Sequence, residues 1–108
     1  QVSTGQVQLA ASPTLSVLYH DTAVQILGAA ESLTFTQQVE QVACGVNHVA
    51  VLLLGENQAT SLRIYDKTGA QTDQMDFQNG ELVDFGFAQT QDDTLWTLEM
   101  TPSGSLPP

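Results

Sequence analysis

The sequence predicts an all-β fold, and three observations lead to that prediction. Short segments rich in β-branched and aromatic residues recur along the chain, and turns containing Gly and Asp separate them. No segment combines helical periodicity with capping residues. The best helical candidate, residues 36–44, is rich in Gln and Val and has no N-cap. We therefore expect no helix longer than two turns in the middle of the chain.

The expected strands follow from alternation and turn chemistry, taken in order. Two apolar segments joined by Asp21 and Thr22 predict a hairpin, and residues 32–36 alternate between polar and apolar. Residues 48–54 form a continuous apolar run, which is typical of a strand that is buried on both faces. A small-residue strand near Gln8 comes first. The other expected strands are, in chain order, 15–20, 23–27, 32–36, 48–54, 62–65, 74–77, 82–87 and 94–98.

The strand at residues 62–65 leads into a turn formed by residues 66–69. Alternation places Leu62 and Ile64 on one face of this strand, and Arg63 and Tyr65 on the other. In the turn, an Asp side chain can accept backbone hydrogen bonds and Gly supplies positive φ. The strand is therefore expected near the rim of a sheet, with an exposed turn after it.

Arg63 and Lys67 are the only basic residues of the chain, against 12 acidic ones. We expect them to form local ion pairs with Asp66, Asp73 or Asp76, each worth about 0 to 1 kcal/mol. The sharper alternative is a basic recognition site made of these two residues. The net charge of -10 argues against nucleic acid and against an anionic membrane surface as partners.

The order of strands repeats along the chain. Residues 8–19 can be laid on residues 42–53 without a gap, an offset of 34 residues, and a third copy starts at Val83, 41 residues after the second. Each copy is a small-residue strand, a short break and an apolar strand, and two further strands follow the first two copies. A period of about 35 to 45 residues with four strands per unit is typical of β-propeller blades. We therefore expect residues 1–108 to form a single all-β unit with blade-like repeats at about 7–38, 39–80 and, in part, 81–108.

The segment from Val42 to Leu98 resembles the blades of the broad WD-repeat, YVTN and TolB-like propeller group. The matching stretches are Ala50-Val-Leu52, 61–69, 83–87 and Leu95-Trp-Thr-Leu98, while the Trp-Asp dipeptide of WD repeats is absent. The resemblance implies four-stranded antiparallel blades that are incomplete within this chain, since a propeller has about 4 to 8 blades. The chain would be part of a longer propeller, or several copies would assemble. The alternative is a closed β-sandwich.

The core is expected to come from the most apolar strands. We expect five side chains to be substantially buried: Leu52, Leu54, Ile64, Phe85 and Trp96. The single cysteine, Cys44, lies in an apolar segment and is expected to be a buried, unreactive thiol.

Side chains capable of chemistry are present but do not form a recognised motif. His20 and His48 lie near turns, Asp92 and Asp93 are adjacent in a turn expected to be solvated, and the supply of zinc ligands is poor. No nucleophile elbow, phosphate loop, dinucleotide fingerprint or calcium loop occurs. Trp96 and Tyr65 could form a sugar-stacking platform, although a core position is expected for the Trp, since it lies within an apolar strand. We predict no catalytic, cofactor-binding or metal residues and no cofactor.

Three functions remain open at this stage. The first is a non-catalytic binding or scaffold module that presents loops to a protein or peptide partner. The second is a carbohydrate-binding propeller module, and the third is part of a larger propeller enzyme. No apolar run is long enough for a membrane span, so no direct membrane insertion is expected in this segment. Low Lys content, high Gln and Thr content and the lack of a cysteine pair favour an extracytoplasmic bacterial protein, either secreted or membrane-anchored. An open set of blades would also form a homo-oligomer or belong to a longer chain.

Overall fold

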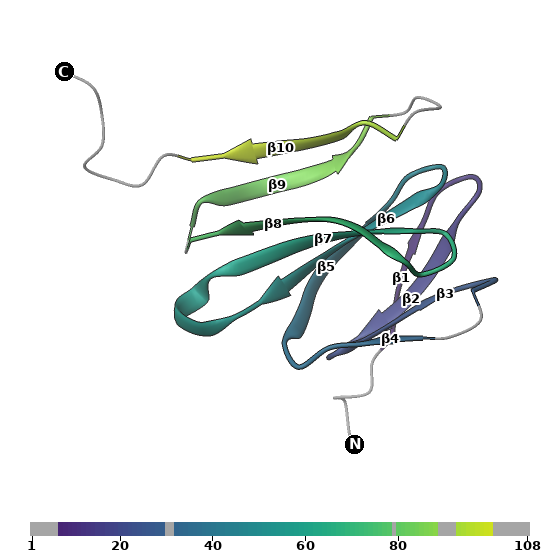
Figure 1. The fold of residues 1–108 in the computed structure, drawn as a ribbon, viewed down its shortest axis with the longest axis horizontal. Helices are drawn as coiled ribbons and strands as arrows, with labels where there is room; N and C mark the ends of the chain where they lie inside the picture. Colours follow the sequence, from purple (N-terminus) through teal and green to yellow (C-terminus); the bar gives the residue numbers. More distant parts are fainter. Residues whose placement is uncertain (1–6, 30–31, 79, 89–92, 101–108) are drawn as a thin grey trace.

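The computed structural model describes residues 7–29, 32–78, 80–88 and 93–100, and within them the fold is all-β. Two four-stranded antiparallel sheets and one two-stranded hairpin follow one another along the chain. We call them the first sheet, the middle sheet and the C-terminal hairpin. Figure 1 shows the middle sheet between the hairpin and the first sheet. Each sheet is a meander in which sequential strands pair, so every connection is short.

Most strands coincide with segments that the sequence predicts as strands, and within each sheet they are arranged in sequence order. The first sheet consists of β1 (Gln8–Ala11), β2 (Ser16–His20), β3 (Ala23–Ile26) and β4 (Leu33–Thr34). The middle sheet consists of β5 (Gln38–Cys44), β6 (His48–Leu54), β7 (Thr60–Asp66) and β8 (Gln71–Phe77). The hairpin consists of β9 (Leu82–Phe87) and β10 (Leu95–Glu99).

The best helical candidate, residues 36–44, is not a helix. β5 occupies most of it. Val39 and Val42 are three residues apart, yet both face the first sheet, because the strand is bulged between Val39 and Gln41. One short 3₁₀ turn, η2 (Glu56–Gln58), lies in the loop between β6 and β7. No described helix is long and apolar enough to cross a membrane.

The two faces of the middle sheet pack against different neighbours. Along β6, Val49, Val51 and Leu53 are fully buried against the first sheet, whereas Ala50 packs with the hairpin residue Phe85. This explains the continuous apolar run of residues 48–54, because both side-chain rows of that strand are covered. At about 25 cal/mol per Å² of apolar surface, these two interfaces are the main source of stability.

The alternation expected for β7 is confirmed. Leu62 and Ile64 join the core shared with the hairpin, while Tyr65 joins the core shared with the first sheet. Tyr65 contacts the Phe35 ring edge-on, with centroids 6.1 Å apart. The turn after β7 is held by Asp66, whose carboxylate accepts from the backbone N–H groups of Thr68 and Ala70.

The burial prediction is right for two of its five residues. Ile64 and Phe85 are buried, with 6% and 4% of their surface exposed, whereas Leu52 and Leu54 are half-buried. The prediction that Trp96 is buried is wrong, since 44% of its surface is exposed. In β10 it lies on the face opposite the residues that pack on the middle sheet, so an apolar run there is covered on one side only.

The same hydrogen bond closes the first turn of each sheet and of the hairpin. Ser12 N–H donates to Leu15 O, Gly45 N–H to His48 O, and Ala88 N–H to the carbonyl of residue 94. These bonds make Ser12, Gly45 and Ala88 equivalent, so the offsets are 33 and 43 residues rather than 34 and 41. The sequence alignment was therefore out of register by one residue at the first copy. A slip of one residue exchanges the two faces of a strand, which makes the corrected register decisive below.

The layers are stacked as successive open sheets in the described part of the chain, and they do not form a closed β-sandwich.

Candidate binding site at the turn end

The first turns of the three layers lie together at one end of the molecule, at the right of Figure 1. We call residues 12–15, 45–48 and 93–94 the turn platform. From the first sheet, Ser12 Oγ donates to Gly45 O and Thr14 Oγ1 donates to Val46 O, both at 2.7 Å. Two hydroxyl groups thus bind the backbone of the neighbouring turn, and the two sheets are held in register at this end.

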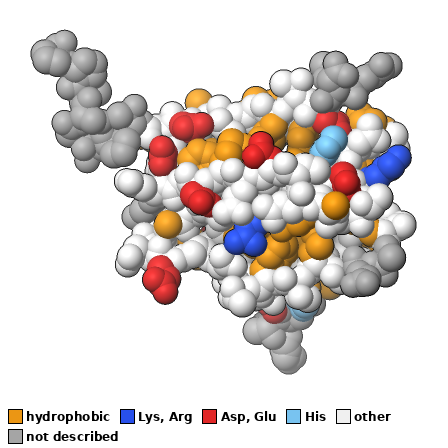
Figure 2. Space-filling model, viewed as in Figure 1, with side chains coloured by type: hydrophobic (Ala, Val, Ile, Leu, Met, Phe, Trp, Pro, Cys, Tyr) orange, Lys and Arg blue, Asp and Glu red, His pale blue; other side chains and the backbone are white. Residues whose placement is uncertain are grey.

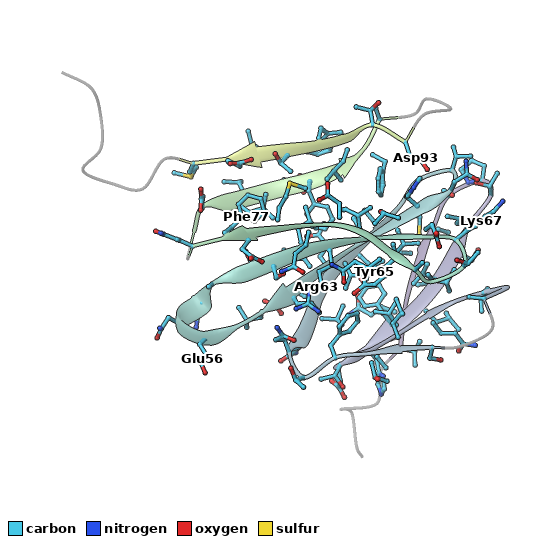
Figure 3. The ribbon with its side chains drawn as sticks, viewed as in Figure 1. Glu56, Arg63, Tyr65, Lys67, Phe77 and Asp93 are labelled. Atoms are coloured by element: carbon cyan, nitrogen blue, oxygen red, sulfur yellow. The ribbon has the colours of Figure 1, made fainter. Side chains whose placement is uncertain are left out.

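Asp93 joins the hairpin to the same central turn. Its carboxylate accepts from Val46 N–H at 2.5 Å and from Asn47 N–H at 2.6 Å, and it lies 2.7 Å from His48 Nδ1. Only 3% of the Asp93 side chain is exposed, against 35% for His48. Figure 3 shows Asp93 directed at this turn. The carboxylate is therefore a clamp between the hairpin and the middle sheet.

The sequence allows this close approach because position 45 is glycine. A Cβ at Gly45 would lie 2.5 Å from Asp93 Oδ1, which is closer than real Cβ contacts, and 3.1 Å from Phe87 Cγ, which is tighter than most of them. Asp93 itself has φ of 49°, a left-handed conformation that Asp tolerates better than most residues. Glycine at position 45 and Asp at position 93 are thus required by one contact.

The pKa of Asp93 lies below its ordinary value. Burial of the carboxyl group acts to raise the pKa, but the hydrogen bonds from His48 and from the N–H groups of Val46 and Asn47 together outweigh it. Asp93 is therefore ionised near neutral pH. The expectation of a solvated turn is wrong for Asp93, while Asp92 lies outside the described residues.

The remaining acidic and His residues do not assemble with this network. Within the described ranges, no group of three or more His, Cys, Asp or Glu side chains could hold a metal ion. His20 lies 3.8 Å from Asp21 at the surface, in the first sheet. Asp73 and Asp76 belong to the exposed strand β8. Of the candidate residues that the structure describes, His48 and Asp93 are joined in this network, as a structural pair.

The two basic residues do not form the expected ion pairs. Among the described residues, no carboxylate lies within 4 Å of Arg63 or Lys67. Figure 2 shows the two cationic side chains apart from each other on the side of the molecule that faces the viewer. Arg63 lies 5.9 Å from the centre of the Phe35 ring instead, a cation–π distance. The Asp76 carboxylate on β8 accepts from Gln74 Nε2 at 3.0 Å instead, and hydrogen bonds from Gln74 and Ser61 together with the charge of Arg63 lower the pKa of Asp76. The aromatic ring offers Arg63 a packed surface.

An open hollow lies beside the turn platform. It is lined from the first sheet by Thr14, Leu15, Leu27, Gly28 and Ala29, and from the middle sheet by Lys67 and Thr68. Leu27 is 47% exposed, so the hollow has an apolar side next to an ammonium group and two hydroxyl groups.

The expectation of a buried Cys44 is met only in part, and its low reactivity stays a prediction. Cys44 is free and half-buried, and burial raises its pKa to about 11, so the thiolate is scarce at neutral pH.

Trp96 and Tyr65 do not form a sugar-stacking platform. Tyr65 is buried between the first and middle sheets, whereas Trp96 lies on the outer face of the hairpin.

Sequence reasoning missed the platform, because its members are separated by more than 30 residues. The only available signals were the repeated turn positions and the Gly at position 45. No protein family, curated protein or solved structure matches this chain.

Proposed function

We propose that this chain is a set of propeller-type blades that acts as a non-catalytic scaffold and presents the turn platform to a protein or peptide partner. The observation that carries the proposal is the hydrogen-bonded row of turns. Ser12, Thr14 and Asp93 connect three separate layers at one end of the molecule, so residues 12–15, 45–48 and 93–94 are held in fixed positions. A preorganised surface binds with a smaller loss of conformational entropy than mobile loops do.

The chemistry of the hollow indicates the kind of peptide. Lys67 stands beside Leu27 and the hydroxyl groups of Thr14 and Thr68. A partner with an acidic residue next to an apolar side chain would match these groups. Because the rest of the chain is strongly acidic, Lys67 would be the local attraction that directs such a partner to this end.

A displayed library of random peptides provides the test. Peptides selected on the wild-type chain should be enriched in a carboxylate beside an apolar residue, and Lys67→Glu should weaken their binding at least about tenfold, or about 1.4 kcal/mol. Glu56→Lys is the control, since Glu56 lies in the exposed η2 turn at the other end of the molecule (Figure 3).

Two results would refute this proposal. One is a selection without enrichment, and the other is equal binding to the Lys67→Glu and wild-type chains. Binding to a glycan array in place of peptides would favour the carbohydrate-binding alternative.

A further inference from the structure

The corrected register shows which exposed side chains occupy positions that are buried elsewhere in the chain. Counted from the turn-closing hydrogen bond, Leu9 is equivalent to Val42 and Leu18 to Val51. Val42 and Val51 are 7% and 0% exposed, because the first sheet covers them. Leu9, in contrast, is 64% exposed.

Leu9 and Leu18 are paired across β1 and β2, so they share the outer face of the first sheet. We call this face the head face. The other side chains that the strand register places on it are neutral apart from His20: Ala11, Ser16, Ala23 and Gln25.

The outer face of the hairpin shows the complementary situation. Trp96 is equivalent to Ala50 and Leu98 to Leu52, counted from the same closing bond. Ala50 is fully buried and Leu52 is half-buried, both beneath the hairpin. Trp96 is 44% exposed and Leu98 55%. We call the face that carries Trp96 and Leu98 the tail face; the exposed Asp84, which pairs with Leu98, lies on it too.

The interface between the first and middle sheets and the interface between the middle sheet and the hairpin are formed by the same two kinds of face. In each, the side of a layer that carries the Ala50 position packs against the side of the next layer that carries the Val51 position. The tail face presents the first kind of surface and the head face presents the second. The relation that joins the layers inside one chain therefore also describes how a tail face would meet a head face.

The sizes of the side chains point to a second copy. On the middle sheet, the small pair Ala43 and Ala50 packs with the large hairpin residues Phe85 and Phe87. On the tail face the pair is Gly86 and Trp96, and the indole ring lies on the glycine, with a Cβ there only 2.8 Å from the ring. A large indole needs small residues opposite it.

The head face provides such residues at the corresponding positions. Ala11 and Ser16 stand there in place of Cys44 and Val49 of the middle sheet. Trp96 is larger than Ala50 at the equivalent position, and Ala11 and Ser16 on the head face are smaller than Cys44 and Val49 at theirs. The larger side chain on one face is thus matched by smaller side chains on the other.

We propose that the tail face of one copy docks on the head face of a second copy, so that two chains continue the same stack of layers. The contact is heterologous, because different surfaces of the two copies meet. It buries Trp96 over the small pair Ala11 and Ser16, and Leu98 against Leu9 and Leu18. This inference does not depend on the proposed peptide-binding function, since the turn platform is at the end of the layers and not on their faces.

Salt should strengthen the contact. Each copy carries a net charge of -10, so two copies repel each other over long range. Raising the NaCl concentration from 0.1 to 1 M shortens the Debye length from about 10 to about 3 Å and leaves the apolar contact in place. The association constant is therefore expected to rise with salt.

Two variants block one face each. Leu98→Lys places a charge in the tail face, and Leu9→Lys places one in the head face. Both lower the net negative charge, so general repulsion cannot explain a loss of association. Gln71→Lys on the exposed strand β8 makes the same change of charge outside both faces and serves as the control. Thermal melting confirms that each variant is folded.

Sedimentation equilibrium of the 108-residue chain gives the decisive result. The wild type and Gln71→Lys should exceed the monomer mass as concentration rises, whereas Leu98→Lys and Leu9→Lys alone should remain monomeric. An equimolar mixture of the two blocked variants should form a dimer and nothing larger, because one intact tail face and one intact head face remain. The emission of Trp96, the only Trp, should shift to shorter wavelength in that mixture.

Three outcomes would overturn the proposal. The wild type stays monomeric in 1 M NaCl, or Leu9→Lys still dimerises alone through a symmetric tail contact, or the mixed variants fail to associate.

Discussion

Removing the Asp93 carboxylate should destabilise the fold more than any other single change at the turn end. In the chain, that carboxylate accepts from two backbone N–H groups of the central turn and pairs with His48. Asp93→Ala leaves the part-buried Val46 N–H without its partner and frees the hairpin from the middle sheet at this end. The fold should remain all-β, because the two core clusters do not depend on this side chain.

The magnitude follows from the number and exposure of the bonds. A hydrogen bond to a charged group contributes about 1.5 to 3 kcal/mol, but Asn47 and His48 are partly in contact with water and contribute less. We expect a loss of about 2 to 4 kcal/mol in the free energy of unfolding. For a domain of this size that corresponds to a fall in Tm of about 10 to 20 °C. Asp93→Asn keeps one acceptor and should cost about half as much.

Urea unfolding followed by circular dichroism measures the loss. Asp73→Asn is the matched control, because Asp73 is exposed on β8 and its carboxylate accepts from the N–H of the adjacent Gln74. The control should change stability by less than about 0.5 kcal/mol. If Asp93→Ala changed stability by no more than the control, the clamp would contribute nothing and the reasoning would be refuted.

Four further predictions follow from the same contacts. Folding lowers the pKa of Asp93, so the stabilisation by its carboxylate is present above the unfolded pKa of about 3.9 and is lost as pH falls through the lower folded pKa. The difference in unfolding free energy between wild type and Asp93→Asn should therefore shrink below about pH 4. A difference that grows there would contradict the prediction. Gly45→Ala should destabilise the chain by at least about 2 kcal/mol in the same urea assay, since its Cβ meets Asp93, and an unchanged midpoint would argue against the close approach. Cys44 should react with a disulfide reagent far more slowly in the native chain than in urea, because burial raises its pKa to about 11; equal rates would show that the thiol is open. Leu53→Ala should cost about 2 to 5 kcal/mol and Leu54→Ala clearly less, since the first is fully buried and the second half-buried, and equal losses would disprove the assigned faces.

Around Arg63 and Lys67, the turn could be predicted from the local sequence, but the contact of Arg63 depends on how the sheets pack. The turn after β7 was predictable, because Asp66 and Gly69 provide the acceptor and the positive φ that such a turn requires. The partner of Arg63 was not, since Phe35 lies in the connection between β4 and β5, 28 positions away in the sequence. Ion pairs were expected from sequence proximity, and stacking on an aromatic ring depends on how the sheets meet.

The sequence by itself determined the strands of this protein. Apolar runs and the chemistry of Asp and Gly turns act over a few residues, so they predict β6 (His48–Leu54) and β9 (Leu82–Phe87) to the residue, although residues 36–44, which contain β5, were the best helical candidate. Only the tertiary structure decided which face of each strand is covered and which turns touch. Trp96 and Val51 both lie in apolar strands, yet one is exposed and the other buried, because the stacking of layers covers one face of β10 and both faces of β6. Asp93 likewise looks like an ordinary turn residue until folding brings it to Val46, since a contact between residues 47 positions apart leaves no local trace in the sequence.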